Sequence, residues 1–404
     1  MKFKTLAIVL FVAFLAIALV GCNGGDAGGG DDGTTTATGV TTYTIGVAAP
    51  ITQGSVAQGM DIKRGAQLAI ETMNESEEAK AAGVQFKMVE GDDMSDDKTA
   101  VTVANTLISD RNLIGVVGHY NSRCSIPASA VYSEANVVMI SPGSTNPDLT
   151  LQGLSGVFRT CATDDLQGPA GALFALDMGL KKAIVIDDSD TYGEGIADFF
   201  YEAFEDNGGT VLFREKTQVA ERDFTALATK ITAENPDIVF FGGGFETIAP
   251  FSKQMHDAGS SAPIMGGDAM AEQDYIDIGG SSVEGDYVTN VGAPVEGLPA
   301  AQDFVAAYKA RFNLDSVGNF ASYAYDAAFA IMKAALIVHE ETGDVTTPAG
   351  RDALIAEVEK SNFEGVTGTI SFNENGDTNN KVISLYKVVD QAWEFVESMD
   401  LGAK

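Results

Sequence analysis

Basic side chains, histidine and tryptophan are scarce in this chain. Its 404 residues contain 25 Lys and Arg against 57 Asp and Glu, so the formal net charge is -32. Nucleic-acid binding depends on clustered Lys and Arg that neutralise phosphates. The composition therefore argues against a nucleic-acid partner and is typical of a solvated, exported protein.

The motifs of common enzymes are absent as well. The chain has no G-x-S-x-G nucleophile elbow, no H-E-x-x-H zinc site and no phosphate-binding loop. Its histidines, His119, His256 and His339, are far apart in sequence. The acidic run GDDMSDD could hold calcium, but such a run is more often a solvated loop and helix cap. We expect no catalytic residue, no cofactor and no metal.

The amino terminus has the pattern of an export signal. Lys2 and Lys4 precede an uncharged apolar run from Leu6 to Val20. The run ends in LVGC, which resembles the box that directs lipid onto bacterial lipoproteins. The resemblance implies that residues 1–22 are a signal peptide and that lipid on Cys22 anchors an exported protein to the membrane, in the periplasm or on the outer cell surface. A plain uncleaved anchor is the alternative.

Residues 23–42 are mostly Gly, Asp and Thr, so they have little to bury. They predict a disordered tether with a reach of roughly 25 Å. The other two cysteines are Cys124 and Cys161. Outside the cytoplasm such a pair can oxidise, but a disulfide needs Cα atoms within about 7 Å. The sequence leaves a bridge and two free thiols both open.

After the tether, short β-branched apolar runs alternate with amphipathic helical patterns. Repeated β-then-α order predicts parallel sheets with helices on both faces. The roughly 360 residues of this part exceed what one core usually holds, which favours two lobes. We expect strands at residues 43–48, 84–90, 113–118, 137–141, 183–187, 211–214, 238–242 and 263–265, and helices at 61–75, 98–110, 193–207, 224–234, 247–258, 298–312 and 320–339. Strand-like runs at 367–372 and 381–388 flank an Asn-Gly turn, which is a hairpin cue.

Two polar loops follow neighbouring expected strands between residues 113 and 149. In an open parallel sheet, ligands bind beyond the carboxyl ends of the strands, where the N–H groups of helix N-termini favour an anion. Two adjacent hydroxyl-bearing loops suit a small carboxylate there, although each hydroxyl alone could simply cap a helix or close a turn. The polar residues are Asn121, Ser122 and Arg123 in the first loop and Ser141, Gly143, Ser144 and Thr145 in the second.

Several further segments are distinctive, in this order: GSVAQGMDIKRGAQLAI, GDDMSDDKTAV, IGVVGHYNSRCSIPAS, VVMISPGSTNPDLT, FRTCATDDLQGPA, DSDTYGEGIA, FFGGGFE and PIMGGDAM. With the β/α alternation, they resemble the leucine/isoleucine/valine-binding group of ABC-transporter solute-binding proteins, from about Tyr43 to the carboxyl end. The resemblance implies an α/β type I periplasmic-binding-protein fold, with two Rossmann-like lobes joined by a three-crossover hinge. The lobes would be residues 43–161 plus 292–381, and residues 162–291 plus 382–404.

Carried over segment by segment, the resemblance implies contacts to a zwitterion held between the lobes. Ser122 would bind the ligand carboxylate by its hydroxyl and backbone N–H. In the loop that also contains Ser144, the Thr145 hydroxyl and the Gly143 carbonyl would add contacts. Asp268 would be the counter-ion of the ammonium, where the family commonly has Glu. Tyr192 would cover the ligand from the second lobe.

The chain departs from the family where relatives often place aromatic side chains against the ligand. Gly59 and Gly244 stand at these positions, and Phe245 follows as a candidate ligand contact. These departures predict a roomier site that admits larger side chains, aromatic or polar. Arg123 could meet a second carboxylate on the ligand, or it could pair locally or point to solvent.

The resemblance implies a binding protein, not an enzyme, that captures an amino acid, branched-chain or related, and delivers it to the permease subunits of an ABC transporter. We expect it to act as a monomer. Two alternatives remain open. The same fold could bind an amide, a urea-like compound or an aromatic acid, or it could serve as a ligand sensor without transport.

Overall fold

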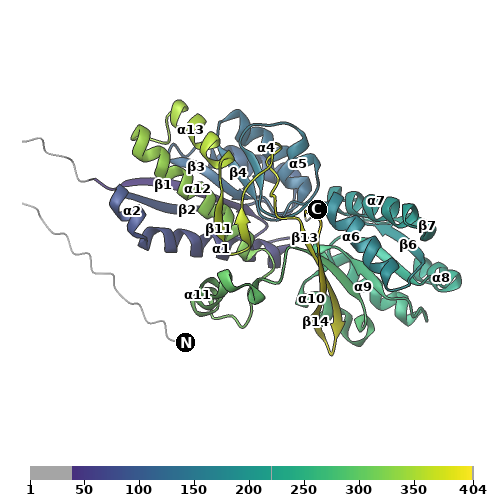
Figure 1. Cartoon of the computed structure of the whole chain (residues 1–404). Coiled ribbons are helices and arrows are strands. Elements are labelled where there is room, and N and C mark those ends of the chain that lie inside the picture. The colour runs from purple at the N-terminus through teal and green to yellow at the C-terminus, as the bar shows by residue number, and fades with distance from the viewer. Residues whose placement is uncertain (1–38, 220, 403–404) are drawn as a thin grey trace, which may run out of the picture. The chain divides into compact units, whose positions relative to one another are not determined.

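The computed structural model describes residues 39–219 and 221–402 (Figure 1). The predicted signal peptide, the predicted lipid site Cys22 and almost all of the predicted tether lie outside the described residues. From Val40 onward the chain forms one contact unit. It is built on two sheets that each carry helices on both faces, and the regions around these sheets are called the first and the second lobe here.

The first lobe is organised by a parallel sheet with nearly continuous apolar strands. All six residues of β3 are buried, as expected of a strand covered on both faces. The helices α1 (Val56–Glu75) and α12 (Ala321–Thr342) pack on one face, and α3 (Asp97–Leu107) and α4 (Ser122–Glu134) on the other. The strands, in spatial order, are β2 (Val84–Asp92), β1 (Thr41–Ala49), β3 (Leu113–Gly118), β4 (Val138–Ser141) and β5 (Val157–Arg159).

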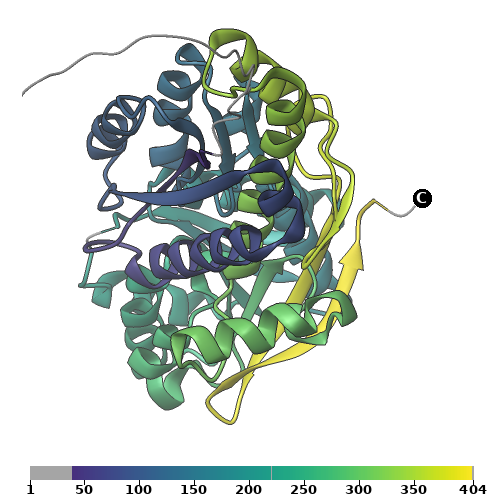
Figure 2. The same ribbon diagram turned by 90° about the vertical axis from the view of Figure 1, so that its left-hand side faces the viewer.

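The second lobe has a seven-stranded mixed sheet. Its helices α6 (Asp164–Asp177) and α7 (Thr191–Asp206) cover one face, while α8 (Thr225–Glu234), α9 (Phe245–Asp257) and α10 (Gln273–Gly279) cover the other. The strands, in spatial order, are β14 (Ala392–Asp400), β13 (Val382–Val389), β10 (Tyr287–Val291), β9 (Ile264–Gly266), β8 (Ile238–Gly242), β6 (Lys182–Asp187) and β7 (Thr210–Lys216). Figure 2 shows β13 and β14 in yellow at the edge of the molecule.

The remaining elements are short or peripheral. They are α2 (Glu77–Ala82), α5 (Asp148–Leu151), η1 (Asp268–Met270), η2 (Gly280–Val283), η3 (Val295–Gly297), η4 (Pro299–Ala301), α11 (Gln302–Phe312), α13 (Pro348–Glu359), β11 (Phe363–Gly365) and β12 (Gly368–Ile370).

The chain passes between the two lobes three times, between β5 and α6, between β10 and α11, and between β12 and β13. The two-lobed α/β fold and its three-crossover hinge are therefore as predicted. The predicted residue boundaries of the lobes stay predictions. The last crossing uses residues 371–381, where Arg159 N donates to the carbonyl of Gly376 and holds the connection against β5.

The predicted hairpin of residues 367–372 with 381–388 is wrong. β12 pairs with β11 instead, and β13 pairs with β14 and β10. The turn of the real hairpin is Asp390-Gln391, and both residues have positive φ, which is the geometry of a two-residue hairpin turn. The Asn-Gly segment folds into a local turn of its own, with Asn373 N donating to the Asp377 carbonyl.

Helix α12 is long and apolar enough to cross a membrane by length and composition. However, 78% of its apolar window is buried inside the body, where Ala324, Ala328 and Ile331 pack in the core of the first lobe. Burial of this kind is typical of the central helix of a folded domain.

Candidate functional site

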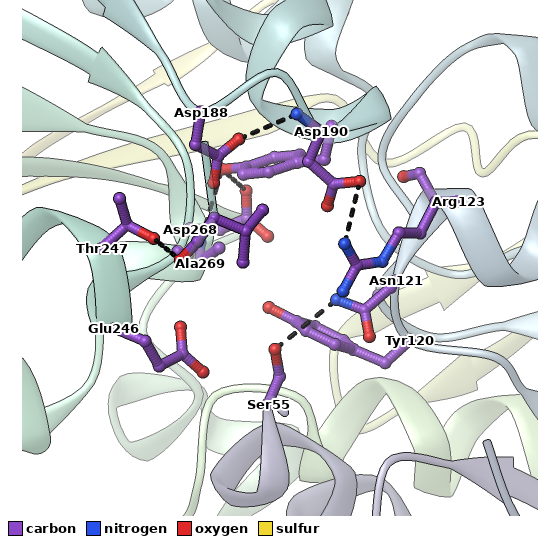
Figure 3. A pocket seen from close by; sticks show the side chains of 15 residues that line it. Ser55, Tyr120, Asn121, Arg123, Asp188, Asp190, Glu246, Thr247, Asp268 and Ala269 are labelled. Carbon is purple, nitrogen blue, oxygen red and sulfur yellow. Dashed lines mark hydrogen bonds and ion pairs between the residues drawn. The ribbon is translucent and has the colours of Figure 1, made fainter. Parts of the chain in front are cut away.

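A pocket lies where the carboxyl ends of strands from both sheets meet (Figure 3). Its empty space is about 510 Å³, counting the part that is open to solvent. The position is the one expected for ligands of open α/β sheets. The lining residues are Ser55, Tyr120, Asn121, Ser122, Arg123, Gly143, Asp188, Asp190, Tyr192, Val219, Gly244, Glu246, Thr247, Asp268 and Ala269.

Ser122 begins α4 at the wall of the pocket. It is only 2% exposed, and its Oγ accepts a 3.3 Å hydrogen bond from the Asn146 N–H. That bond leaves the hydroxyl proton of Ser122 available to an acceptor in the pocket. The first N–H groups of a helix have no intrahelical partner and lie at the positive end of the helix dipole. This wall can therefore bind an anionic group.

Asp268 and Tyr192 lie on the part of the pocket wall that the second lobe provides. Tyr192 Oη donates a 3.0 Å hydrogen bond to Oδ1 of Asp268. Burial raises the pKa of Asp268 to about 6, and the hydrogen bond from Tyr192 partly opposes the shift. A buried carboxylate without a cation beside it can bind the positive end of a ligand.

Asp164, at the start of α6, adds a second carboxyl close to Asp268. Its side chain is fully buried, and neither of its carboxyl oxygens has a hydrogen-bond partner among the described residues. Burial raises the pKa of Asp164 well above its ordinary value, and the negative charge of Asp268 adds to the shift. A cation between the two carboxyls would stabilise both of them.

The buried side chain of Arg159 fixes the loop that follows β4. Arg159 forms a 2.7 Å ion pair with Asp377, and its Nη1 donates to the carbonyl oxygens of Ser144 (2.7 Å) and Asn146 (2.9 Å). This arrangement holds Gly143 at the pocket, where the ring of Tyr120 leaves no room for a side chain.

The structure brings four of the seven predicted ligand contacts to the pocket, namely Ser122, Gly143, Tyr192 and Asp268. Ser144, Thr145 and Phe245 lie outside its lining. Ser144 Oγ is used within the protein, since it donates to the Tyr120 carbonyl at 2.7 Å. Thr145 is buried, and Phe245 packs in the apolar core of the second lobe.

Gly244 lines the pocket and Gly59 does not, and the prediction of a roomier site stays a prediction. A Cβ on Gly59 would collide with the backbone of Pro50. A Cβ on Gly244 would come within 2.6 Å of Oε2 of Glu246. The pocket is therefore polar at the place where relatives were expected to carry an aromatic side chain.

Other candidate groups have structural roles. Cys124 and Cys161 are free, buried thiols. Within the acidic run, Asp96 caps α3 by accepting from Thr99 N at 2.8 Å, and Asp93 contacts Nδ1 of buried His119 at 2.7 Å. No group of three or more potential metal ligands occurs in residues 39–219 and 221–402.

Sequence reasoning missed several residues that line or border the pocket, including Ser55, Asp188, Glu246 and Asp164. The sequence carries a signal for two of them, because Asp188 directly follows a clear strand and Glu246 follows the end of the FFGGG strand. Ser55 and Asp164 lie near the site only because of tertiary packing, and the sequence around them carries no local signal of this.

Comparisons with known proteins show the family of this chain. The sequence model described as periplasmic binding protein matches residues 42–392. The chain belongs to this family. It is 34% identical over 345 residues to the Leu/Ile/Val-binding protein homolog 3 of Brucella melitensis, covering 85% of this chain and 90% of that protein. It is 35% identical over 351 residues to a leucine-, isoleucine-, valine-, threonine- and alanine-binding protein of Pseudomonas aeruginosa, covering 86% and 90%.

The fold of this periplasmic binding protein is also that of a solved leucine-binding protein from Thermotoga maritima. The TM-score is 0.79 at 29% identity, covering 89% of this chain and 99% of that one. Family members are substrate-binding proteins rather than enzymes, and they act outside the cytoplasm. The family assignment from sequence is thus confirmed.

Proposed function

We propose that this protein captures an amino acid between its lobes and delivers it to the permease subunits of an ABC transporter. The observation that supports the proposal best is the pairing of two unlike walls in one pocket. The start of α4, with Ser122, suits a carboxylate, and Asp268 suits an ammonium. A zwitterionic amino acid carries both a carboxylate and an ammonium.

The backbone of the second loop completes the proposed site. Gly143 lies in the lining, which supports the proposal that its carbonyl accepts from the ammonium. Tyr192 aligns Asp268 by hydrogen bonding and closes the site from the second lobe. We also propose that lipid on Cys22 anchors the exported protein to the membrane as a monomer, with residues 23–42 as the tether.

The proposal is tested by mass spectrometry of the compound released when protein purified from its native host is denatured. Calorimetry then measures the affinity of the protein for that compound and for the common amino acids. Ser122→Ala and Asp268→Ala should each weaken binding by about 1.5 to 3 kcal/mol, the scale of a charge-assisted hydrogen bond. Lys181→Ala, an exposed substitution remote from the pocket, is the control and should bind as the wild type does.

A released compound without a carboxylate, or unchanged affinity in both variants, would overturn the proposal. The role in transport is tested separately, by uptake of the labelled compound in host cells that lack this chain. Undiminished uptake, with binding intact, would favour a sensor instead.

A further inference from the structure

The part of the pocket away from Ser122 and Asp268 is lined by hydrogen-bond acceptors. Glu246 lies in the first turn of α9, and its Oε1 is buried without a hydrogen-bond partner in the described part of the chain. Asn121 precedes α4, and its Oδ1 is likewise buried and unpartnered. Figure 3 shows the two side chains at the cavity, with Ser55 and Tyr120 between them.

The carboxyl of Glu246 lies beside Gly244 in the pocket lining. Oε2 of Glu246 lies 2.6 Å from the position of a Cβ on Gly244, so the carboxyl occupies space that a side chain at that position would fill. An aliphatic ligand side chain there would bury Oε1 of Glu246, which has no hydrogen-bond partner, against hydrocarbon, and this is costly. A donor on the ligand would pair it instead.

The charge balance of the pocket favours a cationic donor. Asp188, Asp190, Glu246 and Asp268 are acidic, and Arg123 is the single cationic side chain among the described residues of the lining. Arg123 already faces Asp190, with Nη1 3.5 Å from Oδ1. Burial raises the pKa of Glu246, with Ser55, Arg222 and Arg123 opposing the shift. Burial also raises the pKa of Asp188 to about 7.

We infer that the ligand is an amino acid whose side chain ends in a cationic hydrogen-bond donor, an ammonium or a guanidinium, which contacts Glu246 and Asn121. This inference rests on the proposed function, because Ser122 and Asp268 hold the α-carboxylate and the α-ammonium. The cationic group of the ligand side chain then donates to Oε1 of Glu246 and Oδ1 of Asn121, which have no partner among the described residues. Neutral aliphatic side chains bind less well, since they leave Oε1 of Glu246 without a hydrogen-bond partner.

Calorimetry at pH 7.5 with lysine, ornithine, arginine, glutamine, leucine and glutamate tests the inference. We expect at least one of the cationic amino acids to bind about tenfold or more tightly than leucine and glutamine. Glu246→Gln should remove most of that preference while leaving the affinity for leucine unchanged or higher. Glu234→Gln makes the same chemical change at the exposed end of α8 and should keep the wild-type preference.

Each other outcome is decisive. Leucine or glutamine binding as tightly as every cationic amino acid overturns the inference and leaves the proposed function standing. A cationic preference that survives in Glu246→Gln also overturns it, because the preference would then come from elsewhere. Failure of every amino acid to bind overturns the proposed function itself.

Discussion

Arg123 of α4 and Asp190, the residue before α7, face each other across the pocket, with Nη1 of Arg123 3.5 Å from Oδ1 of Asp190. The two residues belong to different lobes. Close by, Asn146 Nδ2 donates a 2.9 Å hydrogen bond to the Thr191 carbonyl. These contacts connect the start of α7 to the two loops of the first lobe, so they stabilise the arrangement in which the lobes enclose the pocket.

Arg123→Ala should weaken ligand binding modestly. The Arg123 side chain is 30% exposed, and partly exposed ion pairs contribute at most about 1 kcal/mol, or roughly fivefold in affinity. Calorimetry at low salt and at high salt measures the effect, and the gap to the wild type should shrink with salt because exposed charges are screened. Arg311→Ala breaks an ion pair with Glu71 inside the first lobe and should leave affinity unchanged. Equal affinity of Arg123→Ala and wild type at low salt would contradict the role in closure.

Affinity for an amino acid should fall below about pH 6. Burial raises the pKa of Asp268 to about 6, and only the ionised carboxyl attracts an ammonium. The contribution of Asp268 to binding is therefore constant well above this pH and decreases as Asp268 gains its proton, by up to about tenfold per pH unit. Titrations from pH 5 to pH 8 test this. Asp268→Asn should bind more weakly and have a flatter profile, although Asp188 and Glu246 also titrate in the pocket. An identical slope in wild type and Asp268→Asn would refute the assignment.

The sequence was sufficient for the fold and for part of the pocket lining from each lobe. Apolar runs such as Leu113–Gly118 and Ile238–Gly242 are strands that the structure buries completely, because a strand covered on both faces needs apolar residues throughout. Ser122 and Gly143 follow strands of the first sheet, and Tyr192 and Asp268 follow strands of the second, so the order of elements places them at the carboxyl ends of these strands. Short-range pattern and topology together determine these positions.

The remaining features depend on packing that local sequence does not encode. Ser144 was expected at the ligand, but its hydroxyl bonds to the Tyr120 carbonyl, and that choice depends on how the two loops meet. Phe245 precedes Glu246, and the helix start at α9 turns the ring into the core while the carboxyl lines the pocket. The hairpin was predicted at the Asn-Gly turn because that dipeptide is the stronger local signal. The hairpin of the structure joins β13 and β14 instead, and its turn is Asp390-Gln391.

The buried carboxyls of Asp61 and Glu272 should make the ligand-free protein less stable as the pH rises. Burial raises the pKa of Asp61 to about 7, although Arg64 opposes the shift. Burial also raises the pKa of Glu272, with Asp61 adding to it. The folded state binds these protons more tightly than the unfolded chain, in which Asp has a pKa of about 4. This contribution to stability is therefore fully present below about pH 4 and is lost as the pH rises through about 7.

Asp61→Asn should reduce the loss of unfolding free energy between pH 5 and pH 8, as measured by urea unfolding at several pH values. It keeps an oxygen that can accept from the backbone at Phe320 and Asn319, so the fold is preserved. Glu75→Gln removes an exposed carboxyl from the same helix and should leave the pH dependence of the wild type. A variant Asp61→Asn with the full pH dependence would show that the carboxyl titrates normally.

Asp326 holds the small sheet of β11 and β12 against α12, and its removal should cost stability without affecting the pocket. Oδ1 of Asp326 accepts from Val366 N at 2.9 Å, and Oδ2 accepts from Thr367 N at 2.9 Å and Thr367 Oγ1 at 2.7 Å. Asp326→Ala leaves these buried donors without an acceptor, so the free energy of unfolding should fall by about 3 kcal/mol.

Urea unfolding at pH 8 measures this effect, because the pKa of Asp326, raised by burial to about 6, leaves the carboxyl ionised at that pH. Asp326→Asn should lose less, since one oxygen still accepts from Val366 or Thr367. Asp315→Ala, in an exposed loop, should change the free energy of unfolding by less than about 0.5 kcal/mol. The ligand affinity of Asp326→Ala should equal that of the wild type below its unfolding transition, because Asp326 is not among the residues that line the pocket. Loss of affinity without loss of stability would contradict a purely structural role for this carboxyl.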